Sequence, residues 1–156
     1  MKRPAFQFYP DDWTGNAKLK RCDHAAKGVW IDVLCLMHDS EEYGVLRWPL
    51  KDIAQAIGCT PKLLHALADK GVIKGADSGK RCEAYVHQGY HARQALPPVT
   101  LIKAQDGPIW YSSRMVRDEY LRMRRGGETK FTAGTQPNRS PNQRQGEPVT
   151  HGNTRS

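Results

Sequence analysis

The chain has 156 residues, 38% of them hydrophobic, and a formal net charge of +8 at pH 7. This length suits one modest domain with a segment outside its core. No stretch reaches the roughly 18 apolar residues of a membrane span, and the first residues lack the apolar segment of a secretion signal, so we expect a cytoplasmic protein without membrane contact. The positive charge favours an anionic partner, of which nucleic acid is the commonest, although a generic basic protein would carry it too.

The first 22 residues are rich in aromatic and turn-forming side chains, and we expect them to cross the core as an extended arm. Asp23 then fits the N-cap position of a helix. The residues behind it have the spacing of a single apolar stripe: Ala26, Val29, Trp30, Val33, Leu34 and Met37. Gly28 interrupts this stripe at a cost of about 1 kcal/mol.

The middle of the chain predicts two further helices between two strands. The run "YGVLRW" (43–48) is β-prone, and "PLKDIAQAIG" (49–58) predicts a helix that begins after a proline and is closed by Gly58. Thr60 and Pro61 fit the start of a third helix. Its buried face would be Leu63, Leu64 and Leu67, and after Gly71 the run "GVIK" predicts a strand.

The last part of the chain changes character twice. Residues 75–108 mix turn residues with two short β-prone stretches, and "PIWYSSRM" predicts a strand after a turn at Asp106 and Gly107. Residues 114–125 are compatible with a basic helix. Residues 126–156 contain five Gly, three Pro and few large apolar side chains. This composition predicts a disordered basic tail.

The order helix, strand, helix, helix, strand, turn, strand is the outline of a winged helix. In this α+β fold a helix-turn-helix of three helices is followed by a β-hairpin wing. We therefore predict a winged-helix domain over residues 1–125, with an N-terminal arm at 1–22 and an enlarged wing at 75–108. Residues 126–156 would form the tail outside it.

Four segments resemble a family of small phage and prophage proteins of unknown function: "PAFQFYPDDW", "AAKGVWIDVLCLMHDS", "LLHALADKGVI" and "IWYSSRMVRDE". The resemblance covers roughly residues 4–120. Members often occur in replication regions and carry a winged-helix domain similar to that of phage replication initiators. The resemblance therefore implies phage DNA metabolism in a bacterial host and supplies no catalytic residues. The family pattern has a short wing, whereas this chain has roughly 30 more residues there.

Two groups of residues are candidates for DNA contact. On the outer face of the third helix, Lys62, His65 and Lys70 could reach a groove, and Thr60 with the helix N-terminus could hold a phosphate. Asp69 on the same face opposes DNA, which leaves a solvated face as the alternative. The second group is arginine-rich and could contact phosphates without reading sequence: Arg114, Arg117, Arg122, Arg124 and Arg125. From residue 114 onward there are nine Lys or Arg and four Asp or Glu, and a solubilising helix end would look similar.

Other residues give weaker indications. The predicted strand carries Trp110 and Tyr111. We expect Tyr111 in the core, while Trp110 is either buried or free to stack on a base. Cys82, His87 and His91 have the spacing of a weak zinc site, but there is no tight CxxC pair.

No nucleophile, P-loop or metalloprotease motif is found, so we expect no enzymatic activity and no cofactor. Two hypotheses follow. The first is a DNA-binding winged-helix protein of phage or prophage origin, which acts in replication initiation or its regulation and contacts mainly the phosphates of duplex DNA. The second is a protein-protein interaction module that contacts a host or phage replication protein as a helicase or primosome loader, adaptor or inhibitor. Phosphate binding must weaken steeply as salt rises, whereas a packed protein interface need not.

Overall fold

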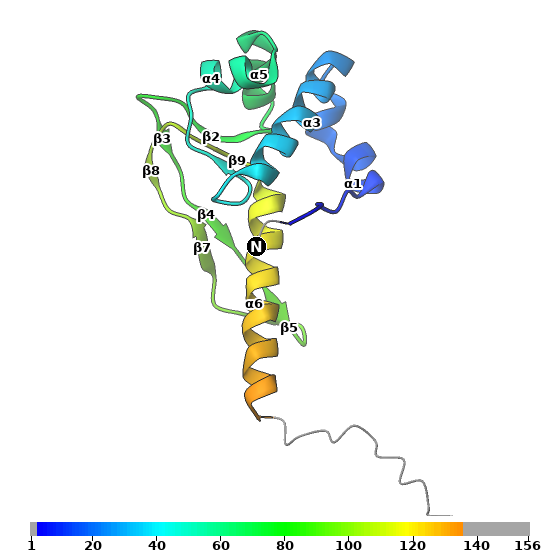
Figure 1. Ribbon diagram of the computed structural model, residues 1–156, viewed down its shortest axis with the longest axis vertical. Coiled ribbons are helices and arrows are strands. Elements are labelled where there is room, and N and C mark those ends of the chain that lie inside the picture. Colours follow the sequence, from blue (N-terminus) through cyan, green and yellow to red (C-terminus); the bar gives the residue numbers. More distant parts are fainter. Residues whose placement is uncertain (1–2, 136–156) are drawn as a thin grey trace, which may run out of the picture. The chain divides into compact units, whose positions relative to one another are not determined.

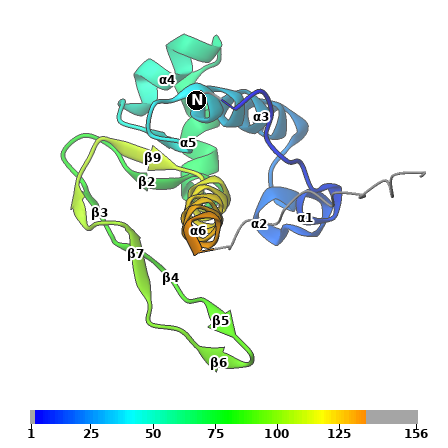
Figure 2. The same cartoon turned by 60° about the horizontal axis from the view of Figure 1, so that its bottom comes forward.

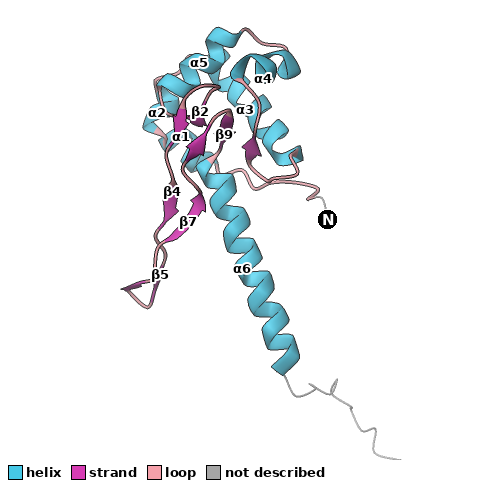
Figure 3. Ribbon diagram, turned by 90° about the vertical axis from the view of Figure 1, so that its left-hand side faces the viewer, coloured by secondary structure: helices cyan, strands magenta, loops and turns pink. Residues whose placement is uncertain are grey.

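A computed structural model describes the backbone of residues 3–135 and the side chains of residues 3–126. Within these residues the fold is mixed α+β, with six helices and small antiparallel sheets (Figures 1 and 3). The chain divides into two compact units, Met1–Met123 and Arg124–Ser156. Helix α6 (Ser113–Thr135) contains the boundary between them. The elements described next belong to the first unit.

Helix α3 (His24–Asp39) forms where the apolar stripe predicts it. Its N-cap is Asp23, whose Oδ1 accepts a hydrogen bond of 2.8 Å from the Ala26 N–H. All six residues of the stripe are buried: Ala26, Val29, Trp30, Val33, Leu34 and Met37. The predicted helix, cap and buried face are therefore confirmed. Gly28 is exposed on this helix, where its missing side chain leaves no gap in the core.

Helices α4 (Leu50–Ile57) and α5 (Pro61–Asp69) follow and pack against α3 and each other (Figure 1). Gly58 closes α4 in the left-handed conformation, with φ at +73°, as its position predicts. In α5, Leu64 and Leu67 are fully buried and Leu63 is half-buried against the same core. Thr60 is at the N-cap, but its side chain accepts no hydrogen bond.

Three short antiparallel strands pair in the order β1-β9-β2: β1 (Val45–Leu46), β9 (Ile109–Tyr111) and β2 (Lys74–Ala76). The central strand β9 is covered on both faces. Trp110 packs in the helical core, the cluster formed mainly by buried residues of α3, α4 and α5. Tyr111 belongs to a second cluster with Val45 and Val116. The core position predicted for Tyr111 is confirmed. Trp110, for which the sequence left two possibilities, is buried as well.

Between β2 and β9 the chain makes a long two-stranded hairpin, seen from another side in Figure 2. It consists of three pairs of short strands: β3 (Arg81–Cys82) with β8 (Gln105–Asp106), β4 (Tyr85–His87) with β7 (Val99–Ile102), and β5 (Tyr90–His91) with β6 (Gln94–Ala95). We call residues 81–106 the ribbon. The sequence predicts only two β-prone stretches here, because each strand is too short to show an alternation of its own.

The N-terminal segment differs from the predicted extended arm. Residues 10–20 form two short helices, α1 (Pro10–Gly15) and α2 (Ala17–Lys20). The Asn16 side chain caps α2 by accepting hydrogen bonds from the N–H groups of Lys18 and Leu19, and Leu19 is buried in the helical core. This local capping, added to burial of Leu19, favours helix over an extended path.

Helix α6 also runs farther than predicted. It ends at Thr135 rather than near residue 125, so residues 126–135, predicted as part of the disordered tail, are helical. The remainder of that predicted tail, residues 136–156, lies outside the described residues. As for a membrane, none of the helices in the described part of the chain combines the length and the apolar character needed to cross one.

Candidate functional site

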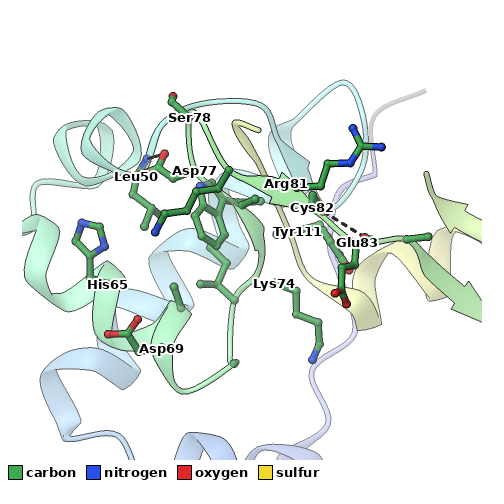
Figure 4. A pocket seen from close by; sticks show the side chains of 18 residues that line it. Leu50, His65, Asp69, Lys74, Asp77, Ser78, Arg81, Cys82, Glu83 and Tyr111 are labelled. Carbon is green, nitrogen blue, oxygen red and sulfur yellow. Dashed lines mark hydrogen bonds between the residues drawn. The ribbon is translucent and has the colours of Figure 1, made fainter. Parts of the chain in front are cut away.

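A pocket of about 630 Å³ opens between helix α5 and the start of the ribbon. Figure 4 shows His65 and Asp69 of α5 on one side and Arg81, Cys82 and Glu83 on the other. Trp110 lies against this space from strand β9. We call it the α5–β3 groove. Residues of α5 and of the start of the ribbon line this same space.

Asp77 fixes the turn that forms one wall of this groove. Its Oδ1 accepts a hydrogen bond of 3.1 Å from the Leu50 N–H, at the first turn of α4 (Figure 4). Pro49, at the N-cap of α4, provides no side-chain acceptor, so Asp77, which is 27 residues beyond Leu50, caps the helix instead. The Asp77 backbone oxygen also accepts from the Lys80 N–H at 3.1 Å. The wall and helix α4 are therefore held together.

The charges around the groove are mixed. Lys74, Lys80 and Arg81 are its cations, and Asp69, Asp77 and Glu83 are its anions. Burial lowers the pKa of Lys74, and the neighbouring charge of Lys18 lowers it further. Arg81 forms an ion pair with Asp106 at 3.2 Å, but both side chains are mostly exposed, so the pair is weak and can exchange for another anion.

The residues proposed for DNA contact on α5 do not all lie in the groove. His65 is exposed and lines the groove, together with Asp69, while Lys62 is exposed elsewhere on the helix. Thr60 is also exposed. The Lys70 Nζ donates a hydrogen bond of 2.7 Å to the Arg21 backbone oxygen, between α2 and α3. Lys70 therefore links two parts of the fold instead of standing on the open face of α5.

Arg114 holds the N-terminal segment. Its guanidinium forms an ion pair with Asp12, lies 3.9 Å from Asp118 and sits over the Tyr9 ring at 4.3 Å from the ring centre. These contacts are internal to the first unit. A structural role for Arg114 is thus accounted for without a phosphate.

The other arginines of α6 have different surroundings. Arg117 is half-buried, and among the described residues its guanidinium has no ion-pair or hydrogen-bond partner. Arg122 is 3.9 Å from Glu119 one turn earlier, an exposed and weak pair. Arg124 and Arg125 are exposed, each has an interaction partner, and both belong to the second compact unit.

The weak metal candidate is not assembled. Cys82 is buried on β3, where its thiol donates to the Glu83 backbone oxygen at 3.4 Å, and burial raises the pKa of that thiol. His87 packs edge-on against Tyr120, with ring centres 5.8 Å apart, and His91 is exposed on β5. In the described part of the chain no three His, Cys, Asp or Glu side chains gather as a metal site would require.

Sequence reasoning did not select the basic residues of the groove wall, Lys74, Lys80 and Arg81. The available signal was the adjacent pair Lys80-Arg81 directly after the turn "DSG". Comparison of the chain with family models, with curated proteins and with solved structures gives no match.

Proposed function

We propose that the first unit is a winged helix-turn-helix that binds duplex DNA mainly through phosphates. Helices α3, α4 and α5 would be its three helices, α5 its recognition helix, and the ribbon its enlarged wing. The chain order α3, β1, α4, α5, β2, ribbon, β9 supports this proposal, together with the sheet order β1-β9-β2. The resemblance to phage and prophage proteins supports a non-enzymatic role in replication initiation or its regulation, in the cytoplasm of a bacterial host.

The observation that carries the proposal is the α5–β3 groove. His65, on the exposed face of α5, and the cations Lys80 and Arg81 line the same space. A duplex lying across α5 would bring one backbone strand to this wall, where flexible cations bind phosphates without reading sequence. Arg81 can exchange Asp106 for a phosphate because the pair is exposed.

The test is fluorescence anisotropy of a labelled random duplex with the full chain. With about four phosphate contacts, affinity should fall roughly 100-fold between about 50 mM and 200 mM salt. The double variant Lys62→Glu/His65→Glu and the single variant Lys80→Glu should both weaken binding. Lys27→Glu, on α3 and outside the groove, makes the same change of charge as Lys80→Glu and should not weaken binding. No binding at low salt, or equal losses in all three variants, would refute a DNA site in this groove.

The groove also offers an argument for the second candidate, a protein interaction module. Asp69 and Glu83 are exposed carboxylates on opposite sides of the same space, and they repel a phosphate backbone. A loader, adaptor or inhibitor that contacts a host or phage replication protein could use both signs of charge. The complex with such a protein would keep most of its affinity at high salt. The same salt titration, with the partner protein in place of DNA, measures this affinity.

A further inference from the structure

The tip of the ribbon exposes a large aromatic side chain. Tyr90 on β5 is 70% exposed, the highest value among the large hydrophobic side chains that the structure describes. Its cross-strand partner is Ala95 and the residue before it is Gly89. Small neighbours leave the ring uncovered, so its faces are available to another molecule.

The ribbon is attached to the rest of the first unit by aromatic contacts. Tyr85 stacks on Tyr111, with ring centres 5.8 Å apart and an interplanar angle of 26°. His87 packs edge-on against Tyr120. Nearer the tip, the Gln88 side-chain amide donates to the backbone oxygens of Gly89 and Leu96. Figure 2 shows β5 and β6 beyond these attachments, at the far end of the hairpin.

The turn at the tip is strained. Ala92 and Arg93 connect β5 to β6, with φ values of +48° and +66°. Hairpin turns with positive φ at both central residues favour Asn-Gly, because other side chains are disfavoured there. Strain of this kind is concentrated at functional sites. The turn keeps an arginine where glycine would be easier to accommodate.

The outer part of the ribbon, beyond the base that carries Glu83 and Asp106, has charge of one sign only. Residues 84–105 contain Arg93 and Lys103 and no Asp or Glu. His91 is also exposed beside Tyr90. A protein partner could use an exposed tyrosine and arginine, but the lack of carboxylates over this length favours a polyanion.

We propose that the ribbon tip binds an unpaired nucleotide: Tyr90 stacks on its base and Arg93 contacts its phosphate. A tyrosine ring gains stacking energy only from a base whose face is free, whereas a duplex groove presents base edges. The protein then prefers duplex DNA that continues into a single strand. This inference rests on the proposed function, because the α5–β3 groove would hold the duplex part.

The experiment uses the full chain with three labelled DNAs: a blunt duplex, the same duplex with a single-stranded overhang, and the single strand alone. The base analogue 2-aminopurine stands at the first unpaired position, so that stacking on Tyr90 quenches its fluorescence. The overhang duplex should bind about tenfold more tightly than the blunt duplex. Tyr90→Ala should remove that preference and the quenching, and Tyr90→Trp should retain both.

Two further variants separate stacking from general effects. Arg93→Gly suits the turn and should leave the fold intact or more stable, yet weaken binding of the overhang severalfold. Val86→Ala is the control, because Val86 is 51% exposed on the same ribbon and outside the tip. It should change neither affinity nor quenching. Circular dichroism establishes that each variant is folded.

The outcomes distinguish the two proposals. If the blunt duplex binds but the overhang brings no gain, or if Tyr90→Ala matches the wild type, the tip inference is wrong and duplex binding stands. Should Tyr90→Ala weaken both duplexes equally, the tip contacts paired DNA and the inference is also wrong. If no duplex binds, Tyr90-dependent quenching on the single strand would still support the tip site, and its absence would overturn both proposals.

Discussion

Gly75 illustrates how a single residue sets the geometry of the sheet. It lies on β2 opposite Trp110, with φ at +133°, and a Cβ built there would be 2.0 Å from the Ile109 backbone oxygen. No side chain can move aside to relieve this overlap, because the obstructing atom belongs to the backbone of β9. Glycine is therefore required both for the conformation and for the strand spacing.

We predict that Gly75→Ala lowers the free energy of unfolding by about 3 kcal/mol, through overlap added to backbone strain. Gly79→Ala is the matched control. Its φ is +77°, but no atom lies within 4 Å of the added Cβ, so only about 1 kcal/mol should be lost. Urea unfolding followed by tryptophan fluorescence measures both, and equal losses would contradict the steric argument.

Tyr111 gives a prediction for alkaline pH. Its burial raises the pKa of the phenol to about 12. An unfolded tyrosine ionises near pH 10, so above that pH the unfolded state loses a proton that the folded state keeps. The stability that Tyr111 contributes is complete below about pH 10 and is lost as pH rises toward about 12.

Tyr111→Phe should therefore flatten the decline of unfolding free energy between about pH 10 and 12. The ring and its stacking on Tyr85 are retained in this variant. Tyr90→Phe, at an exposed ring, is the control and should decline as the wild type does. Denaturant titrations at several pH values test this, and an unchanged slope in Tyr111→Phe would exclude Tyr111 as the group responsible.

At the scale of elements, helix α3 is stabilised both by a local N-cap and by burial of its apolar stripe in the core. The Asp23 cap satisfies an N–H group at the helix start, while the buried stripe from Ala26 to Met37 supplies most of the stability. We predict that Asp23→Ala costs about 1 kcal/mol, whereas Asp23→Ser retains most of the wild-type stability because serine also caps helices. Thermal unfolding compares the two. Equal losses would mean that the carboxylate acts through its charge and not as a cap.

At the scale of the whole molecule, positive charge gathers toward the end of the chain. Residues 1–113 contain 15 Lys or Arg and 12 Asp or Glu, and the rest contains nine and four. The position of each cation in the fold nevertheless decides whether it can bind an anionic partner. Lys70 and Arg114 already bond other parts of the first unit, while Lys80 and Arg81 line the groove.

We therefore predict different roles for two neighbouring arginines. Arg114→Ala should lower the unfolding free energy by about 1 kcal/mol, by removing the Asp12 pair and the contact with Tyr9. It should leave the salt dependence of DNA binding unchanged. Arg117→Ala removes the same charge without an ion pair and should affect stability less. If Arg114→Ala kept full stability and reduced the salt slope, Arg114 would be a phosphate ligand after all.

Much of the helical framework could be predicted because its signals are local. The Asp23 cap, the stripe of α3 and the closing glycine Gly58 each act within one or two turns of chain. The α5–β3 groove could not be predicted in the same way. It depends on Asp77 capping α4 from a distance of 27 residues and on the first residues of the ribbon lining the same pocket as α5.

The candidate metal ligands show that residues close in sequence need not come together in space. Cys82, His87 and His91 are close in sequence, yet three separate strands carry them, and the buried thiol, the packed ring and the exposed ring do not converge. Spacing along a chain predicts convergence only when the intervening conformation is known.

By itself, the sequence determined where α3, α4 and α5 lie, which residues of α3 and α5 are buried, and that positive charge is in excess. Local hydrogen bonds and apolar periodicity suffice for these features. Only the tertiary structure decided which cations remain accessible, which carboxylates face them, and that Tyr90 is exposed at the end of a ribbon. These depend on contacts between residues far apart in the chain, whose pairing no local pattern encodes.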